Sequence, residues 1–238
     1  MRPEILFVLG AVVVIALAIV GYIGRQWRRQ ELAQLAAAMG LAFSEEKDQS
    51  LQDRYSEFAC LKQGDDDRYA FNRLSGTWEG RSTLAFDYHY ETHSTDAKGH
   101  RQSSSHYFSA VIVKSPVPLK SLLVRPEGLL DKMKAFFGAE DINFESAEFS
   151  RRFYVKSPDR RWAYDVLHAQ AIEFLLAMPD FRIQFGSAHV IIWRDDTFSP
   201  ETFRSAWRVA CGLLDRLPNY LIEQQNQFPA QEKTRESY

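Results

Sequence analysis

The sequence predicts an α+β protein: an N-terminal transmembrane helix, then an antiparallel β meander, then a second α/β section with two long helices. Three observations support this class. An uncharged apolar run opens the chain, segments of alternating polarity follow it, and two segments of helical periodicity lie in the second half. The 238 residues are 45% apolar, which is enough for a sizeable core. We expect a membrane anchor with a basic juxtamembrane stretch at 1–29, a soluble domain at 30–222 with a candidate sub-boundary at 126–142, and a disordered tail at 223–238.

The apolar run extends over 19 residues, from Ile5 to Ile23, and contains no charge. At about 1.5 Å per residue, a helix of this length just crosses a hydrocarbon core of roughly 30 Å. Tyr22 and Trp27 lie near its end, where aromatic side chains favour the membrane interface. The arginines that follow indicate a single-pass protein of the cell's inner (cytoplasmic) membrane with its domain in the cytoplasm: Arg25, Arg28 and Arg29. The lipid bilayer is then one partner, through residues 5–23.

A cleaved signal peptide is the alternative reading of the same run. Ala16-Leu17-Ala18 has the small-x-small form of a cleavage site. The apolar run nevertheless continues to Ile23 before it meets an arginine, and the charged segment before it is weak. We therefore favour a retained anchor.

The meander follows a short helix at Gln30–Met39 and a short strand at 41–43. In the segment Ser82–Thr92, Leu84, Phe86, Tyr88 and Tyr90 alternate with polar residues and would share one face of a strand. The segments with strand character are Glu57–Leu61, Arg68–Leu74, Ser82–Thr92, Tyr107–Lys114 and Lys120–Arg125.

Helices and strands are both expected in the second section. Ser157-Pro158-Asp159 is a typical helix start and predicts a helix from Pro158 to Met178, and Ser199-Pro200-Glu201 predicts another up to Leu217. A shorter helix is expected at Gly128–Phe137. Strands are expected at Glu148–Ser157 and, as a hairpin, at Phe181–Phe185 and His189–Trp193.

A cluster of histidines and carboxylates is the main candidate site. On a strand, Asp87, His89, Glu91 and His93 would project from one face, opposite Phe86 and Tyr88, toward solvent or a cleft. Neighbours on one face are about 7 Å apart at Cα, so at most three can share an ion. His89, Glu91 and His93 form the best trio for Zn²⁺, with His100 or His106 as a further ligand that would have to fold back.

The same residues fit a solvated polar hairpin at Thr92–Ser105, and the spacing matches no established zinc pattern. Imidazoles there could also make a pH-sensitive surface. Other motifs point to ordinary structure: the pairs Glu140-Asp141 and Asp195-Asp196 resemble turn and helix-entry residues, and Cys60 and Cys211 resemble buried free thiols.

The segment from Asp141 to Leu167 resembles a bacterial family of membrane-anchored proteins of unknown function. The residues that carry the likeness are Glu148, Phe149, Phe153, Val155, Asp159, Ala163 and Leu167, with Ser150 where the family has Asn. The stretch from Leu74 to Tyr88 is also similar, so the likeness covers roughly residues 30–220. It implies a bacterial, membrane-anchored protein and brings no activity, cofactor or catalytic residue.

For function, we expect a membrane-anchored binding or scaffold module with an unidentified protein partner, rather than an enzyme, because no catalytic set is legible. A net charge of −2 gives no reason to bind nucleic acid. The alternative is a metal-dependent enzyme, or a metal or pH sensor, that uses the histidine-rich hairpin 87–106.

Overall fold

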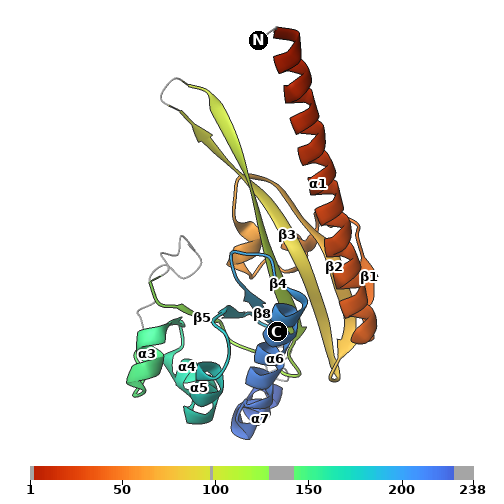
Figure 1. Cartoon of the computed structure of the whole chain (residues 1–238). Coiled ribbons are helices and arrows are strands. Elements are labelled where there is room, and N and C mark those ends of the chain that lie inside the picture. Colours follow the sequence, from red (N-terminus) through yellow and green to blue (C-terminus); the bar gives the residue numbers. More distant parts are fainter. Residues whose placement is uncertain (1–2, 97–98, 129–141, 228–238) are drawn as a thin grey trace, which may run out of the picture.

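The computed structural model describes residues 3–96, 99–128 and 142–227, with side chains from Val12 to Glu223 within these ranges. One antiparallel sheet of eight strands forms its centre, and helices pack on the sheet (Figure 1), which confirms the α+β prediction. The strand order is β1-β2-β3-β4-β8-β7-β5-β6. The strands are β1 (Ala42–Ser44), β2 (Asp66–Trp78), β3 (Arg81–Thr95), β4 (Arg101–Lys114), β5 (Leu122–Pro126), β6 (Phe153–Lys156), β7 (Arg182–Phe185) and β8 (His189–Trp193).

The strands β2, β3 and β4 form the predicted meander, and β7 and β8 form the predicted hairpin. The hairpin strand β8 pairs with β4, and β7 pairs with β5, so the meander and the second section share one sheet. Strand β5 precedes the candidate sub-boundary at 126–142 and its partner β6 follows it. The helix expected at Gly128–Phe137 falls, after its first residue, outside the described residues.

Each face of the sheet covers an apolar cluster. The larger cluster joins alternate sheet residues such as Val111 and Ile192 to most of the helices, and the smaller one joins Ile112 and Ile191 to α2 and η1. Because neighbouring strand residues point to opposite faces, one strand serves both clusters. The helices are α1 (Pro3–Ala38), α2 (Leu51–Arg54), the 3₁₀ helix η1 (Ala59–Lys62), α3 (Ala147–Arg152), α4 (Arg160–Val166), α5 (Ala169–Leu176), α6 (Pro200–Asp215) and α7 (Asn219–Gln227).

Helix α1 is continuous over 36 residues and has two different surroundings. Leu32, Leu35 and Ala36 near its end are buried against the sheet. Its earlier part extends away from the domain (Figure 1), and apolar side chains from Val12 to Ile23 are exposed there. Among the residues whose side chains are described, no helix has both the length and the apolarity to cross a membrane.

Three sequence predictions for local structure are wrong. The segment Glu57–Leu61 is not a strand, and residues 59–62 form η1 instead. The Gln184 side chain accepts from Ala59 N–H and donates to the Glu57 carbonyl. These two bonds take the place of a partner strand. The segment Glu148–Ser157 begins as α3, since Ser146 caps that helix by accepting from Phe149 N–H, and only then becomes β6.

The helix predicted from Pro158 to Met178 is two helices, α4 and α5, separated at Leu167 and His168. His168 hydrogen-bonds through Nε2 to the Arg216 carbonyl at 2.8 Å, and Leu167 is buried beside the break. The backbone leaves helical geometry at Leu167 (φ −97°, ψ 49°) and His168 (φ −70°, ψ 171°), and His168 is the N-cap residue of α5.

The ends of two other segments also differ from expectation. Thr92–Ser105 is mostly strand, because β3 continues to Thr95 and β4 starts at Arg101. Helix α7 extends to Gln227, five residues into the segment with tail-like composition, and residues 228–238 lie outside the described residues.

Candidate functional site

The candidate residues lie on the face of β3 that the larger cluster also uses. Alternation along β3 holds as predicted: Phe86 and Tyr88 join the smaller core, and Asp87 and His89 point to the other side. That other side is not open to solvent, however, since Asp87 is 1% and His89 3% exposed. The prediction of a solvent-facing or cleft-facing row is therefore wrong for these two residues, which α1 and aromatic side chains of neighbouring strands cover.

Asp87 anchors a buried polar network that joins the sheet to α1. Arg28 on α1 donates to both carboxylate oxygens of Asp87, from Nη2 at 2.7 Å and from Nε at 3.1 Å. Asn72 Nδ2 and Ser109 Oγ donate to the same carboxylate at 2.9 and 2.5 Å. Arg28 also donates to the Phe198 carbonyl just before α6. A bidentate pair of this kind fixes both the position and the rotation of α1 on the sheet.

His89 is held in a row of rings that crosses three strands. It pairs with Tyr69 on β2 and with Tyr107 on β4, and the ring centroids lie 4.7 and 4.8 Å from that of His89. Its Nδ1 lies 2.9 Å from the Asp67 carbonyl oxygen. Because a carbonyl oxygen can only accept, Nδ1 carries a proton in this arrangement.

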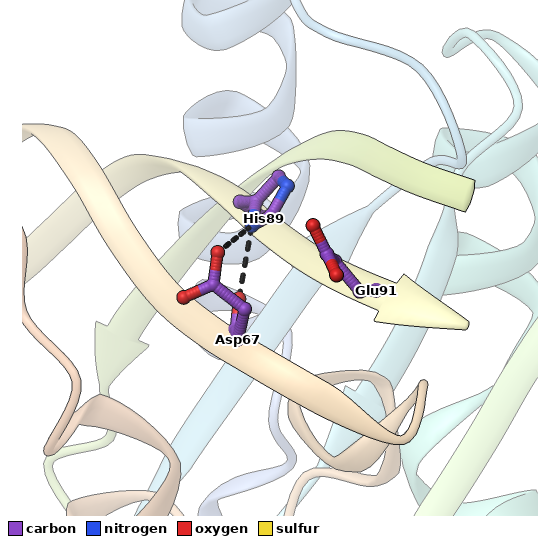
Figure 2. A group of neighbouring side chains, drawn as sticks. All are labelled: Asp67, His89 and Glu91. Carbon is purple, nitrogen blue, oxygen red and sulfur yellow. Dashed lines mark hydrogen bonds and ion pairs between the residues drawn. The ribbon is translucent and has the colours of Figure 1, made fainter. Parts of the chain in front are cut away.

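Asp67, His89 and Glu91 come together as a group with metal-ligand chemistry (Figure 2). One ligand atom from each residue lies within 4.8 Å of the other two. The Asp67 carboxylate oxygen Oδ2 is 3.5 Å from His89 Nδ1, and its side chain is 46% exposed. Glu91 is half-buried, and Ser105 Oγ lies 3.5 Å from its Oε1. The His89 imidazole of this group is therefore buried, whereas the Asp67 carboxylate is accessible to solvent.

Asp67 reaches this group because β2 is irregular there. Asp66 pairs with Glu91 and Tyr69 pairs with His89, so two residues of β2 stand opposite Tyr90 alone. Asp67 adopts φ +46° in this bulge, in the left-handed region that Asp tolerates better than most residues. A second bulge follows between Phe71 and Leu74, where Asn72 adopts φ +48°. Each bulge thus directs a polar side chain toward β3.

The predicted trio is only partly assembled. His89 and Glu91 lie together, but the third member of the group is Asp67 rather than His93. His93 Nδ1 bonds to Ser103 Oγ, and its N–H donates to Asp65. His100 pairs with Asp96 at the hairpin turn, and His106 bonds to Thr92. The sequence marks Asp67 only as part of a Gly-Asp-Asp-Asp turn, and a bulge in the partner strand leaves no signal in that pattern.

The remaining candidates have structural roles. Burial raises the pKa of the Cys60 thiol well above its ordinary value and that of Cys211 to about 11, so neither offers a thiolate near neutral pH. The Asp195 carboxylate pairs with Arg182 and the Asp196 carboxylate with Arg194, so each has its own basic partner. Glu140 and Asp141 lie outside the described residues.

The hollows on the described surface include two that lie apart from the Asp67 group. The larger, of about 510 Å³, lies between the start of α3 and the helices α4 and α5, and is bordered by Phe144, Tyr164, Leu167, Ile172 and Leu176 together with His168 and Glu173. The smaller, of about 280 Å³, is bordered by Tyr90, His106, Tyr107, Phe108 and Asp195. Neither brings together a nucleophile and a base at hydrogen-bond distance.

No family model matches the chain, and no curated protein matches its sequence. Among solved structures, it is similar to the crystal structure of the mycobacterial trehalose monomycolate transport factor A, TtfA, at 14% identity and a TM-score of 0.59. The likeness covers 80% of this chain and 96% of that chain. At this identity the comparison concerns the fold alone, so the chain shares its α+β fold with a mycobacterial transport factor.

Proposed function

We propose that this protein is a membrane-anchored binding module that assists the transport of envelope lipids in a bacterium, without chemistry of its own. Helix α1 would hold the domain at the cytoplasmic face of the inner membrane. The sheet and its helices would form a rigid platform for a protein of the transport machinery. One observation carries this proposal: a single helix has exposed apolar side chains at one end and is locked to the sheet at the other.

The exposed apolar side chains support the anchor. Val14, Leu17 and Val20 are 66%, 67% and 68% exposed, which is costly for such residues in water and favourable in lipid. The uncharged run begins at Ile5, before the first described side chain. The arginines after the run favour a cytoplasmic domain by the positive-inside rule.

The Arg28–Asp87 network supports the platform. Since α1 has no break between its exposed part and its packed part, the domain cannot rotate freely about the anchor. Such a domain presents the same surface to a membrane partner at all times. The fold shared with a mycobacterial lipid-transport factor favours envelope lipid transport as the process, and the absence of a legible catalytic set among the described residues favours binding over catalysis.

Membrane fractionation tests the anchor. We expect the wild-type chain to stay in the membrane after carbonate extraction. The double substitution Val14→Asp/Ile15→Asp should release it, because each aspartate at a helix centre costs about 3 kcal/mol of insertion free energy. The matched control Gln30→Asp/Gln34→Asp changes exposed positions of the same helix outside the run and should remain bound. Release of the wild-type chain by carbonate would contradict the anchor.

A deletion strain tests the transport role. Pulse-labelled lipids should accumulate at the inner membrane when the gene is removed, and the wild-type chain should restore their export. The Val14→Asp/Ile15→Asp chain should not restore it, because the platform would no longer be held at the membrane. An unchanged lipid distribution in the deletion strain would refute lipid transport and leave the anchor intact. Crosslinking of the wild-type chain in native membranes would then identify its protein partner.

A further inference from the structure

We propose that Asp67, His89 and Glu91 form a binding site for a divalent transition-metal ion of the Zn²⁺ class. This site is independent of the proposed function, because it lies on β2 and β3 and uses no residue of α1 (Figure 2). It contains two of the three residues that the sequence predicts, with Asp67 in place of His93.

The distances suit an ion between the three side chains. In a tetrahedral site with bonds of about 2.0–2.1 Å, ligand atoms lie about 3.3 Å apart. The Asp67 Oδ2 to His89 Nδ1 distance of 3.5 Å is close to that value. One ligand atom from each of Asp67, His89 and Glu91 lies within 4.8 Å of the other two. Small rotations of the exposed Asp67 and the half-buried Glu91 side chains would complete the geometry.

The Asp67 carbonyl oxygen is available as a further ligand. It lies 2.9 Å from His89 Nδ1, which is close to the separation of about 3 Å between adjacent ligands in a five- or six-coordinate site. Asp67 could therefore contribute both its carboxylate and its carbonyl. One imidazole with several oxygen ligands favours Zn²⁺ or a related transition ion over Mg²⁺, which prefers oxygen and water alone.

The imidazole is held in place before an ion arrives. Its ring lies between Tyr69 and Tyr107, and the bulge in β2 places Asp67 beside Nδ1. Ring and carboxylate therefore lose little conformational freedom on binding. The partly exposed Asp67 side chain leaves a path from solvent.

The charge around the group also favours a cation. In the part of the chain that the structure describes, neither Asp67 nor Glu91 forms an ion pair with Lys or Arg. Asp65 and Asp66 are adjacent in the chain, and the nearby Arg68 guanidinium is turned toward the Gln63 and Gly64 carbonyls. The Lys47 ammonium lies over the ring of Tyr69, 3.8 Å from the ring centroid. A divalent ion would neutralise the two carboxylates.

Metal binding must change the proton on His89. Without metal, Nδ1 carries a proton that it donates to the Asp67 carbonyl. A metal bound at Nδ1 replaces that proton, and the neutral ring then carries its proton on Nε2. A shift of the His89 proton from Nδ1 to Nε2 is therefore the spectroscopic sign of a metal bound at this ring.

The test uses the full chain, purified without a histidine tag in detergent and stripped of metal with a chelator. We expect calorimetric titration with ZnCl₂ and elemental analysis to show one bound ion, and Mg²⁺ not to displace it. Asp67→Asn and Glu91→Gln should each weaken binding about tenfold or more, because each removes a charged ligand. Asp96→Asn, which disrupts the Asp96–His100 pair at the hairpin turn, is the matched control and should bind like wild type.

A second measurement keeps the assignment testable if a variant loses stability. In the ¹⁵N-histidine spectrum of the wild-type chain, Zn²⁺ should move the His89 proton from Nδ1 to Nε2. The absence of zinc binding by the wild-type chain would overturn the proposal. So would zinc binding that Asp96→Asn abolishes and Asp67→Asn leaves unchanged, or bound zinc with an unchanged His89 tautomer.

Discussion

Arg28 and Asp87 illustrate, at the scale of the residue, how one ion pair can secure an entire helix. The Asp87 side chain is 2% exposed and also accepts from Asn72 and Ser109, so its buried carboxylate oxygens have hydrogen-bond donors. Arg28 keeps 21% of its side chain exposed, which moderates the cost of losing its counter-ion. Asp87 therefore links α1 to the sheet through a charge-assisted pair of hydrogen bonds.

We expect Asp87→Asn to lower the free energy of unfolding by about 2–3 kcal/mol, because it leaves the Arg28 guanidinium partly buried without a counter-charge. Chemical denaturation of the detergent-solubilised chain measures this loss. The matched control is Arg29→Ala, which removes an exposed pair with Glu45 and should cost less than about 1 kcal/mol. Equal losses for the two variants would argue against a special role of Asp87.

The buried Cys211 thiol should make the stability of the folded chain depend on pH in the alkaline range. Burial raises the pKa of its thiol from 9.0 to about 11 in the folded chain. Between these values the unfolded chain releases this proton and the folded chain keeps it, so the folded state loses stability as pH rises. The stability that the folded chain has when this thiol is protonated in both states is fully present below pH 9 and is lost progressively up to about pH 11.

Cys211→Ser should therefore flatten the fall of unfolding free energy between pH 9 and 11. The difference in slope should approach about 1.4 kcal/mol per pH unit. The tyrosines that titrate in the same range are present in both chains, so their effect cancels. Superimposable pH profiles of the two chains would contradict the expectation.

At the scale of the element, Gly212 allows helix α6 to pack closely against α5. A Cβ atom at Gly212 would collide with the ring of Phe174 on α5, so the two helices can approach this closely only with glycine. The other face of α6 is polar and exposed at Arg208. The close approach explains a glycine in the middle of a helix that its own propensity disfavours.

Gly212→Val should lower the free energy of unfolding by about 2–3 kcal/mol, since the branched side chain overpacks the contact between α5 and α6. Arg208→Val, at an exposed position of the same helix, should change it by less than about 0.5 kcal/mol. Thermal unfolding monitored by circular dichroism compares the two. A Gly212→Val chain as stable as wild type would mean that α5 moves away at little cost.

The long hairpin of β3 and β4 has a consequence at the scale of the whole molecule. It extends on the same side of the domain as the exposed part of α1, whereas the turn between β2 and β3 lies at the opposite end (Figure 1). Strand β3 has 15 residues and so separates its two ends by about 45–50 Å. If α1 is a membrane anchor, the hairpin end lies on the membrane side of the domain and the other end lies away from the membrane.

A fluorophore attached at Thr95→Cys should therefore be quenched by spin-labelled headgroups in reconstituted vesicles. The same fluorophore at Glu79→Cys, just before the other end of β3, should not be quenched. Labelling should be selective, because Cys60 and Cys211 are buried. Equal quenching at both positions would contradict this orientation of the domain.

The amino-acid sequence by itself determines the local features of this protein. The uncharged run before the arginines, the alternation of Phe86 and Tyr88 with polar residues, and the Ser-Pro-Glu start of α6 are local patterns that need only neighbours in the chain. From them follow the α+β class, the meander, the β7–β8 hairpin and two of the three residues in the proposed metal site, His89 and Glu91.

Only the tertiary structure decides what depends on distant partners. Asp67 enters the metal-ligand group through a bulge defined by pairing with β3, and Gln184 turns residues 59–62 away from strand geometry. His168, at the break between α4 and α5, bonds to a carbonyl 48 residues away, and the buried Asp87 pairs with Arg28, 59 residues before it. Long-range hydrogen bonds and burial outweigh local preferences of about 1 kcal/mol or less, so no local pattern could have revealed these features.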